Sequence, residues 1–256
     1  FSENDFVISG YDKNGAPIVT GYKDGVPSQK ALESGSFVYG PGDIKFKDLD
    51  GNGVIDGGTG TLNDHGDLKV IGNTTPRYQY SFRIGGAWKG FDLDMFFQGV
   101  GKWQEWNTSG FVIPFSRGID GVYANQTDYY TDENKNTDAF YPRMYSPNGS
   151  GGIVPNLLPG RNNFYPQTRY LLNRAYLRFK NLTVGYTLPQ QLTRKAMLEK
   201  VRVYFSANNL CELINKAKKT APLDPEIDGS VTATNGAWGR TDPYTRTLSA
   251  GLQVTF

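Results

Sequence analysis

The sequence has one cysteine, one histidine and no long hydrophobic run, and these shortages exclude several classes of protein. Because a disulfide needs two cysteines, Cys211 cannot form one within this chain. A helical membrane protein needs about 20 consecutive apolar residues per span, and no stretch here approaches that length. An excess of one charge is also lacking, since 27 Lys and Arg stand against 25 Asp and Glu. Without a basic run, the sequence indicates no nucleic-acid partner.

Glycine and aromatic residues are plentiful instead, with 31 Gly, 14 Pro, 15 Phe, 16 Tyr and 4 Trp. Aromatic residues favour β-strands, and Gly and Pro favour the turns between them. This composition predicts an all-β protein. No targeting segment opens the chain and Phe1 is not an initiator residue, so we expect a mature or cut piece of a longer protein.

Alternation of apolar and polar residues marks five strands. From Tyr78 to Trp88 the aromatic and aliphatic residues share one parity, and the same pattern returns in four later stretches. A change of parity near Lys180 and Asn181 predicts a β-bulge there, and 189–200 suggests a turn with some helix. The expected strands span about 78–88, 91–106, 171–188, 200–209 and 244–256.

Three Gly-, Pro- and Asp-rich regions lie outside these strands, at 1–77, 107–169 and 210–243. The connections therefore alternate between short and long, as in outer-membrane barrels with short turns on one side and long loops on the other. A soluble β-sandwich shares the strand pattern and stays open as an alternative. Five strands cannot close a barrel in lipid, so a preceding segment, covalently joined or nicked, must supply the others.

The last residues fit a pattern of alternating polar, small and apolar positions that closes on an aromatic residue. Ser249, Gly251, Val254 and Phe256 carry this pattern. It resembles the terminal signal by which outer-membrane barrels are recognised for assembly.

Several consecutive motifs span about 42–256, and they include GDIKFKDLDGNGVID, VIGNTTPRYQYSFRIGGAWKGFDLDMFFQGVG, YLRFKNLTVGYTLP, VRVYFSANNL and RTLSAGLQVTF. In this order they resemble the C-terminal third of the SusC/RagA family of TonB-dependent outer-membrane transporters. The resemblance implies a plugged antiparallel barrel of about 22 strands that contacts lipid or lipopolysaccharide. It also implies import of oligosaccharides or peptides with a SusD-like surface lipoprotein, powered by TonB through an upstream plug.

Orientation follows from the same resemblance. A periplasmic C-terminus makes the last strand descend, so the long loops 107–169 and 210–243 and the region 1–77 face outside. We therefore expect 1–77 to be an extracellular loop region and 78–256 to hold the C-terminal barrel strands.

An EF-hand-like loop lies at 48–56. Oxygen-bearing residues recur at the spacing that wraps a calcium ion, with Gly53 at the sharp turn. Position 12 of the loop is Thr59, which offers no carboxylate. The family pattern implies an insertion, after which Asp67 or nearby Asp64 returns to the ion. The expected structural Ca²⁺ ligands are Asp48, Asp50, Asn52, Val54 through its carbonyl, Asp56 and Asp67; the alternative is an Asp/Gly turn held by side-chain to backbone bonds alone.

Substrate contact is expected from aromatic side chains in the outer loops, because rings stack on sugar or peptide faces. The candidates are Trp103, Trp106, Tyr123, Tyr129, Tyr130 and Trp238, although the same residues could form an interfacial girdle or a loop core. Basic residues expected in the lumen could meet an anionic substrate or the plug, or form salt bridges; they are Arg174, Arg178, Lys180 and Arg202.

We find no catalytic constellation in the sequence. Asp92 and Asp94 share one strand face, which a polar lumen explains, and His65 has no triad-like partner. The prediction is a non-enzymatic segment of an outer-membrane nutrient importer. The alternative is a secreted calcium-stabilised β-sandwich that acts as an adhesin or glycan-binding module.

Overall fold

The computed structural model describes most of the chain, in two compact units that are treated separately below. Unit 1 comprises residues 1–71 and 107–170, and unit 2 comprises 72–106 and 171–256. The described residues are 1–13, 15–34, 37–107, 110, 112–114, 122–145, 161–218, 220, 224–226 and 244–256. The division differs from the expected boundary at residue 77, because the loop expected at 107–169 belongs to the same unit as the N-terminal region.

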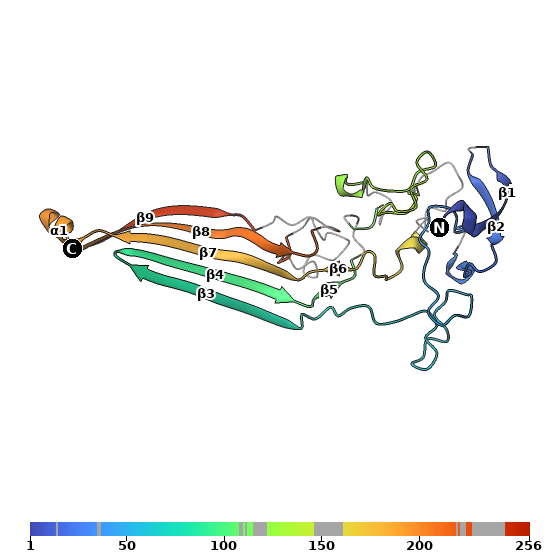
Figure 1. Ribbon diagram of the computed structural model, residues 1–256, viewed down its shortest axis with the longest axis horizontal. Coiled ribbons are helices and arrows are strands. Elements are labelled where there is room, and N and C mark those ends of the chain that lie inside the picture. The colour runs from blue at the N-terminus through green and yellow to red at the C-terminus, as the bar shows by residue number, and fades with distance from the viewer. Residues whose placement is uncertain are drawn as a thin grey trace. The chain divides into compact units, whose positions relative to one another are not determined.

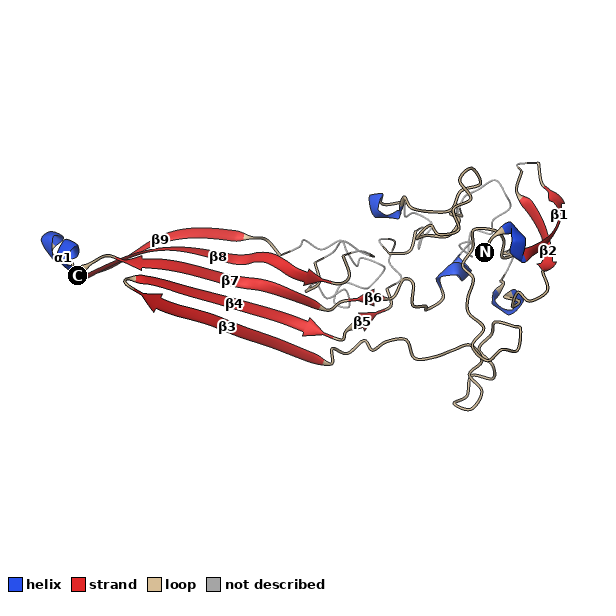
Figure 2. Ribbon diagram, in the orientation of Figure 1, coloured by secondary structure: helices blue, strands red, loops and turns tan. Residues whose placement is uncertain are grey.

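Antiparallel strands dominate the described residues, and helix is scarce (Figure 2). The one α-helix in the described part of the chain is the four-residue α1 (Gln190–Thr193), within the turn expected to hold some helix. No helix among the described residues is long and apolar enough to span a membrane. Short 3-10 turns occur at Glu3–Asp5, Lys30–Leu32, Ala124–Gln126, Arg161–Phe164 and Arg194–Ala196.

Unit 2 is built on a five-stranded antiparallel sheet in the order β3-β4-β7-β8-β9 (Figure 1). Every neighbour in this order is also the next long strand along the chain, so the sheet is a simple meander. Its strands are β3 (Tyr78–Trp88), β4 (Phe91–Gly101), β7 (Tyr176–Thr187), β8 (Lys200–Asn215) and β9 (Thr247–Thr255).

The strand register separates apolar from polar residues across the whole sheet. Phe82 pairs with Phe97, which pairs with Phe179 and, through it, with Cys211. A second row runs through Ile84, Met95, Leu182, Ala207 and Leu248. Because paired residues point to the same side, these rows make one continuous apolar face. The opposite face carries mainly Arg, Asp, Asn, Ser and Thr, together with Phe96, Val100, Tyr176 and Tyr204.

The predicted bulge is present in β7. Phe96 pairs with Asn181 while the next residue, Phe97, pairs with Phe179, which leaves Lys180 as the extra residue. This insertion restores Phe179 and Leu182 to the same face, as the change of parity required.

The sheet has short connections at one end and long connections at the other. The β3–β4 turn is Lys89–Gly90, with φ values of 48° and 89° at the two residues, as a tight hairpin requires. The β7–β8 connection, 188–199, shares this end of the sheet with the C-terminus (Figure 1). The connections 102–175 and 216–246 leave from the opposite end.

Four strand boundaries differ from the prediction by three residues or more, and one of them is the start of β7, at Tyr176 instead of about residue 171. β4 stops at Gly101 because Lys102 adopts a φ of 49°, and the short β5 (Gln104–Glu105) follows, paired with β6 (Leu172–Asn173). β9 begins only at Thr247. β8 continues to Asn215, since Asn209, at φ 51°, makes an irregularity rather than an end and the ladder resumes at Cys211. The first residues of the expected loop 210–243 are therefore strand.

Unit 1 has little regular structure and packs around aromatic side chains. The hairpin of β1 (Phe6–Tyr11) and β2 (Pro17–Tyr22) covers a buried cluster of Phe6, Phe37 and Tyr39. The Phe37 and Tyr39 rings meet edge-on with centroids 4.9 Å apart. Contacts between aromatic side chains, rather than an extended β-sheet, therefore stabilise this unit.

Candidate functional site

The apolar face of the five-stranded sheet is open to its surroundings. Large side chains on each of its five strands are between 37 % and 70 % exposed. Phe82, Phe97 and Phe179 form a stacked ladder across three strands, with centroids 4.7 and 4.5 Å apart. The exposed members are Tyr78, Tyr80, Phe82, Ile84, Trp88, Phe91, Leu93, Val184, Val203, Phe205, Leu248 and Leu252. So large an uncovered apolar surface requires a nonaqueous or protein partner.

The polar face is crossed by ion pairs. Arg83 Nε lies 2.7 Å from Asp94 Oδ2, and Arg202 Nη2 lies 2.5 Å from Asp92 Oδ1. The second pair reaches from β8 to β4 across Gly185 of β7, where a Cβ atom would stand 2.5 Å from both partners. Both carboxylates are thus in ion pairs with arginines of the same sheet. This arrangement indicates a structural role for Asp92 and Asp94 on the polar face.

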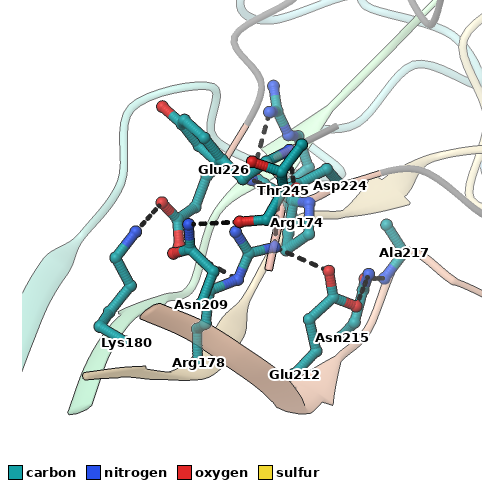
Figure 3. Close-up of polar contacts among 12 residues, drawn as sticks. Arg174, Arg178, Lys180, Asn209, Glu212, Asn215, Ala217, Asp224, Glu226 and Thr245 are labelled. Carbon is teal, nitrogen blue, oxygen red and sulfur yellow. Dashed lines mark hydrogen bonds and ion pairs between the residues drawn. The ribbon is translucent and has the colours of Figure 1, made fainter. Parts of the chain in front are cut away.

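A denser network surrounds Arg178 at the long-connection end of the polar face (Figure 3). Arg178 Nη2 lies 2.8 Å from Glu212 and 2.7 Å from Asp224, and its Nε lies 3.3 Å from Glu226. Lys180 Nζ lies 2.8 Å from the second oxygen of Glu226. The expected lumen cations are therefore in salt bridges, and their partners Asp224 and Glu226 carried no recognisable motif in the sequence.

Trp103, one of the expected substrate contacts, belongs to this end of unit 2. The Arg174 guanidinium lies 3.9 Å from the centroid of its ring, and its indole N–H donates to the carbonyl of Thr74 at 2.8 Å. The ring borders a cleft of about 560 Å³ lined by Thr74, Pro76, Gln79, Val100, Trp103, Glu105, Arg174, Tyr176 and Glu226. Trp103 therefore has a defined cavity beside it, and so does Tyr130, which lines a cavity of about 330 Å³ within unit 1.

The remaining aromatic candidates for substrate contact do not form one cluster among the described residues. Trp106 is half-buried in unit 2, and Tyr123 and Tyr129 are half-buried in unit 1. Tyr130 is only 4 % exposed and its ring packs on Gly42, so it belongs to the core of unit 1 rather than to a loop tip. Trp238 lies outside the described residues.

The EF-hand-like loop brings three of its expected ligands together. Carboxylate oxygens of Asp48, Asp50 and Asp67 all lie within 4.8 Å of one another. Asp67 returns to the loop because its two oxygens accept the N–H groups of Leu49, at 2.5 Å, and Asp56, at 3.0 Å. Convergent carboxylates of this kind suit a hard cation such as Ca²⁺.

The other expected ligands have different roles among the described contacts. Asn52 Oδ1 accepts the N–H of Val54 at 2.7 Å, and Asp56 Oδ1 accepts that of Gly58 at 2.7 Å. Asp64 Oδ2 accepts the N–H of Thr59 at 3.0 Å and stays within the inserted stretch. Between the two acids considered for the return position, the structure places Asp67 beside the loop.

Backbone hydrogen bonds fix the Asp48 carboxylate within the loop. Gly53 N–H donates to Asp48 at 2.9 Å and Gly51 N–H at 2.6 Å, and these bonds lower the pKa of the Asp48 carboxyl. Both glycines have positive φ, which the tight loop requires. Ile55 is 3 % exposed and bonds to Ser28, so the loop is anchored to the segment after β2.

Asp43 is a buried acid that the sequence analysis did not single out. It accepts hydrogen bonds from Asn163 Nδ2 at 2.7 Å, from the Tyr145 hydroxyl at 2.7 and 2.9 Å and from the Gly40 N–H at 2.8 Å. Burial dominates over these bonds and raises the pKa of Asp43 to about 6. The sequence gives no sign of this, because Asp43 follows a glycine in an ordinary turn pattern.

The residues of the expected assembly signal lie in or just beyond β9. Ser249 and Gly251 are on the polar face, where Gly251 lies under the ring of Tyr204. Val254 is on the apolar face, and Phe256 is 90 % exposed. The terminal aromatic side chain is therefore accessible.

Comparison with known proteins identifies the family. No family model matches the chain. The chain is similar to TonB-dependent receptor P3 of Formosa agariphila, with 30% identity over 218 residues that make up 84% of this chain. The chain belongs to the TonB-dependent receptor family. It spans 19% of the length of that receptor.

The chain is also similar to solved structures. The chain is similar to the RagAB peptide importer in its open-open state, with 24% identity, a TM-score of 0.48, and coverage of 77% of this chain and 19% of that chain. In the closed-closed state the match has 20% identity, a TM-score of 0.48, and coverage of 98% of this chain and 21% of that chain.

Proposed function

We propose that the chain is a C-terminal wall segment of a plugged outer-membrane barrel of about 22 strands, which imports oligosaccharides or peptides. The open apolar face of the sheet carries this proposal. In hydrocarbon those side chains need no covering, whereas in water they would have to be buried. Membership of the TonB-dependent receptor family and the meander topology support the same function.

The edges of the sheet support a larger barrel. β3 and β9 each have one ladder partner among the described residues, so each leaves a row of backbone groups unpaired. Such groups cost several kcal/mol each in lipid, and closure with further strands satisfies them. The upstream part of the same barrel would supply those strands and the plug.

Orientation and partners complete the proposal. The end with the short connections and the C-terminus would face the periplasm, and the end with connections 102–175 and 216–246 would face outside. On the sequence resemblance, a SusD-like lipoprotein of the SusC/RagA type would close the outer side and TonB would act through the plug. The lumen would be the polar face.

A soluble β-sandwich is the competing architecture. It would need a second sheet over the apolar face, and the described part of unit 2 leaves that face exposed. The two are separated by purification of the complete polypeptide that carries this chain. A barrel requires detergent and migrates differently on denaturing gels before and after boiling. A protein that stays monodisperse without detergent and shows no such shift would be a sandwich.

We further propose that the EF-hand-like loop binds Ca²⁺ for a structural purpose. The convergence of Asp48, Asp50 and Asp67 supports this, and an ion would neutralise three like charges that otherwise repel. Affinity in the extracellular range, on the order of 10⁻⁴ to 10⁻³ M, is expected. The ion would order a loop on the outer side of the membrane.

A further inference from the structure

The chain's own residues fill a cationic site on the polar face of the sheet. Arg174, Arg178 and Lys180 present their cationic groups at the long-connection end of β7 (Figure 3). Asp224 and Glu226, from the connection between β8 and β9, occupy them as described above, and Pro225 accepts a bond from Arg174 Nη2 at 3.1 Å. Two carboxylates two residues apart therefore sit on this cationic site like a bound acidic ligand.

The same segment is joined to the start of β9. Tyr244 N–H donates to Asp224 Oδ2 at 3.1 Å, and the Tyr244 ring lies 5.1 Å from Lys180 Nζ and 5.7 Å from the Arg178 guanidinium. Asn209 Nδ2 donates to the Thr245 carbonyl at 3.2 Å. Both flanks of the stretch 227–243 are thus fixed at this site, so releasing Asp224 and Glu226 would free one flank.

The numbers of cations and carboxylates in this network differ, and the difference favours exchange of the Asp224–Glu226 segment for an added anion. Three cations face four carboxylates, those of Glu105, Glu212, Asp224 and Glu226, so an added anion is repelled while the segment is in place. With the segment gone, three cations face two carboxylates and the site attracts an anion. Arg178 Nη1, on a side chain only 4 % exposed, also has no hydrogen-bond acceptor among the described residues. Glu226 Oε1 of the segment also lacks a hydrogen-bond partner there, so the segment satisfies the site only in part.

We propose that Arg174, Arg178 and Lys180 form a carboxylate-binding site, and that a ligand bearing several carboxylates takes it by displacing the Asp224–Glu226 segment. This inference rests on the proposed importer function and specifies its substrate class as acidic. The neighbouring cleft of about 560 Å³ is bordered by Glu226 and Arg174, and the ligand would reach the site through it. Acidic peptides and uronic-acid oligosaccharides share this chemistry.

Binding to the complete polypeptide in detergent tests the proposal. The probes are hexaglutamate and oligogalacturonate, with hexaglutamine and a neutral oligosaccharide as controls, followed by calorimetry. At least one acidic probe should bind, and the Asp224→Asn/Glu226→Gln double variant should bind it about tenfold more tightly, because the internal competitor is neutralised. The matched control Glu133→Gln/Asp138→Asn changes two exposed acids of unit 1 and should leave the affinity unchanged.

Hydrogen exchange provides a second readout that needs no variant. Saturation with a bound acidic probe should increase amide exchange in peptides that cover Asp224–Glu226. Failure of both acidic probes to bind either protein, or binding without this increase, would overturn the proposal and leave the network as a structural one. The gel shift on boiling is independent of these probes, so failure of the site and failure of the barrel are distinguishable.

Discussion

Asp67 and Asp64 lie three residues apart in the inserted stretch, yet their carboxylates have different partners. Asp67 joins Asp48 and Asp50, while Asp64 bonds to Thr59. Asp67→Asn should weaken Ca²⁺ binding at least about tenfold, since it removes a charge from the shell. Asp64→Asn, in the same stretch, should not change the affinity. Calorimetric titration with CaCl₂ measures both, and equal affinities for the two variants would contradict the assignment of Asp67.

Asp43 makes the stability of unit 1 depend on pH. Its pKa is raised in the folded state to about 6, so its contribution is fully present below the unfolded value near 4 and is lost as the pH rises through 6. Asp5, whose pKa is lowered to about 2 beside Lys45, changes protonation below this window.

The Asp43→Asn variant isolates this effect. In the unmodified protein, intrinsic-rate-corrected amide protection of residues 37–46 should fall by up to about a hundredfold between pH 4 and pH 7. The variant should show nearly constant protection over that range. A variant that keeps the full pH dependence would show that another group is responsible.

Single residues were predictable where a motif fixes their spacing. The loop from Asp48 to Asp56 and the return of Asp67 follow from such spacing, and Asp67 was favoured by the family pattern. Asp43 and Glu226 were not predictable, since their burial depends on partners such as Asn163 and Arg178, far away in the sequence. Tyr130 was a candidate for substrate contact with a loop core as the alternative, and its packing on Gly42 leaves no local signal in the sequence that decides between them.

Strands were predictable where alternation is uninterrupted. β3 has the expected bounds, and the bulge at Lys180 follows from the change of parity. The far end of β8 was missed because Asn209 interrupts the alternation while the ladder to β7 continues. Long-range pairing with Glu212 opposite Arg178 sustains that part of the strand, and such pairing leaves no periodic signal.

Gly185 allows an ion pair to pass over a central strand. Because a Cβ there would stand 2.5 Å from the side-chain ends of both Arg202 and Asp92 and would displace their ion pair, Gly185→Ala should destabilise the sheet by about 0.5 to 1 kcal/mol. Gly86→Ala is the matched control, since nothing lies within 4 Å of a Cβ at Gly86. The temperature at which the gel shift is lost measures both. If Gly86→Ala lowers it as much as Gly185→Ala, the ion pair is not what requires glycine.

At the scale of the whole molecule, we propose that one face of the sheet meets a nonpolar medium and the other a polar one. The separation is continuous over five strands and includes paired residues far apart in sequence, such as Phe82 and Phe97 or Val203 and Leu252. A soluble protein would hide the apolar face, and here it is exposed. Membership of the TonB-dependent receptors agrees with a membrane setting for this arrangement.

Spin labels at successive positions of β8 test this claim most directly. Nitroxides would replace Val203, Tyr204, Phe205 and Ser206 one at a time in a Cys211→Ser background of the complete polypeptide, reconstituted in lipid. Collision with oxygen, which concentrates in hydrocarbon, should be high at 203 and 205, and collision with a water-soluble nickel complex should be high at 204 and 206. The same accessibility at all four positions, or the reverse alternation, would contradict a membrane-facing apolar surface.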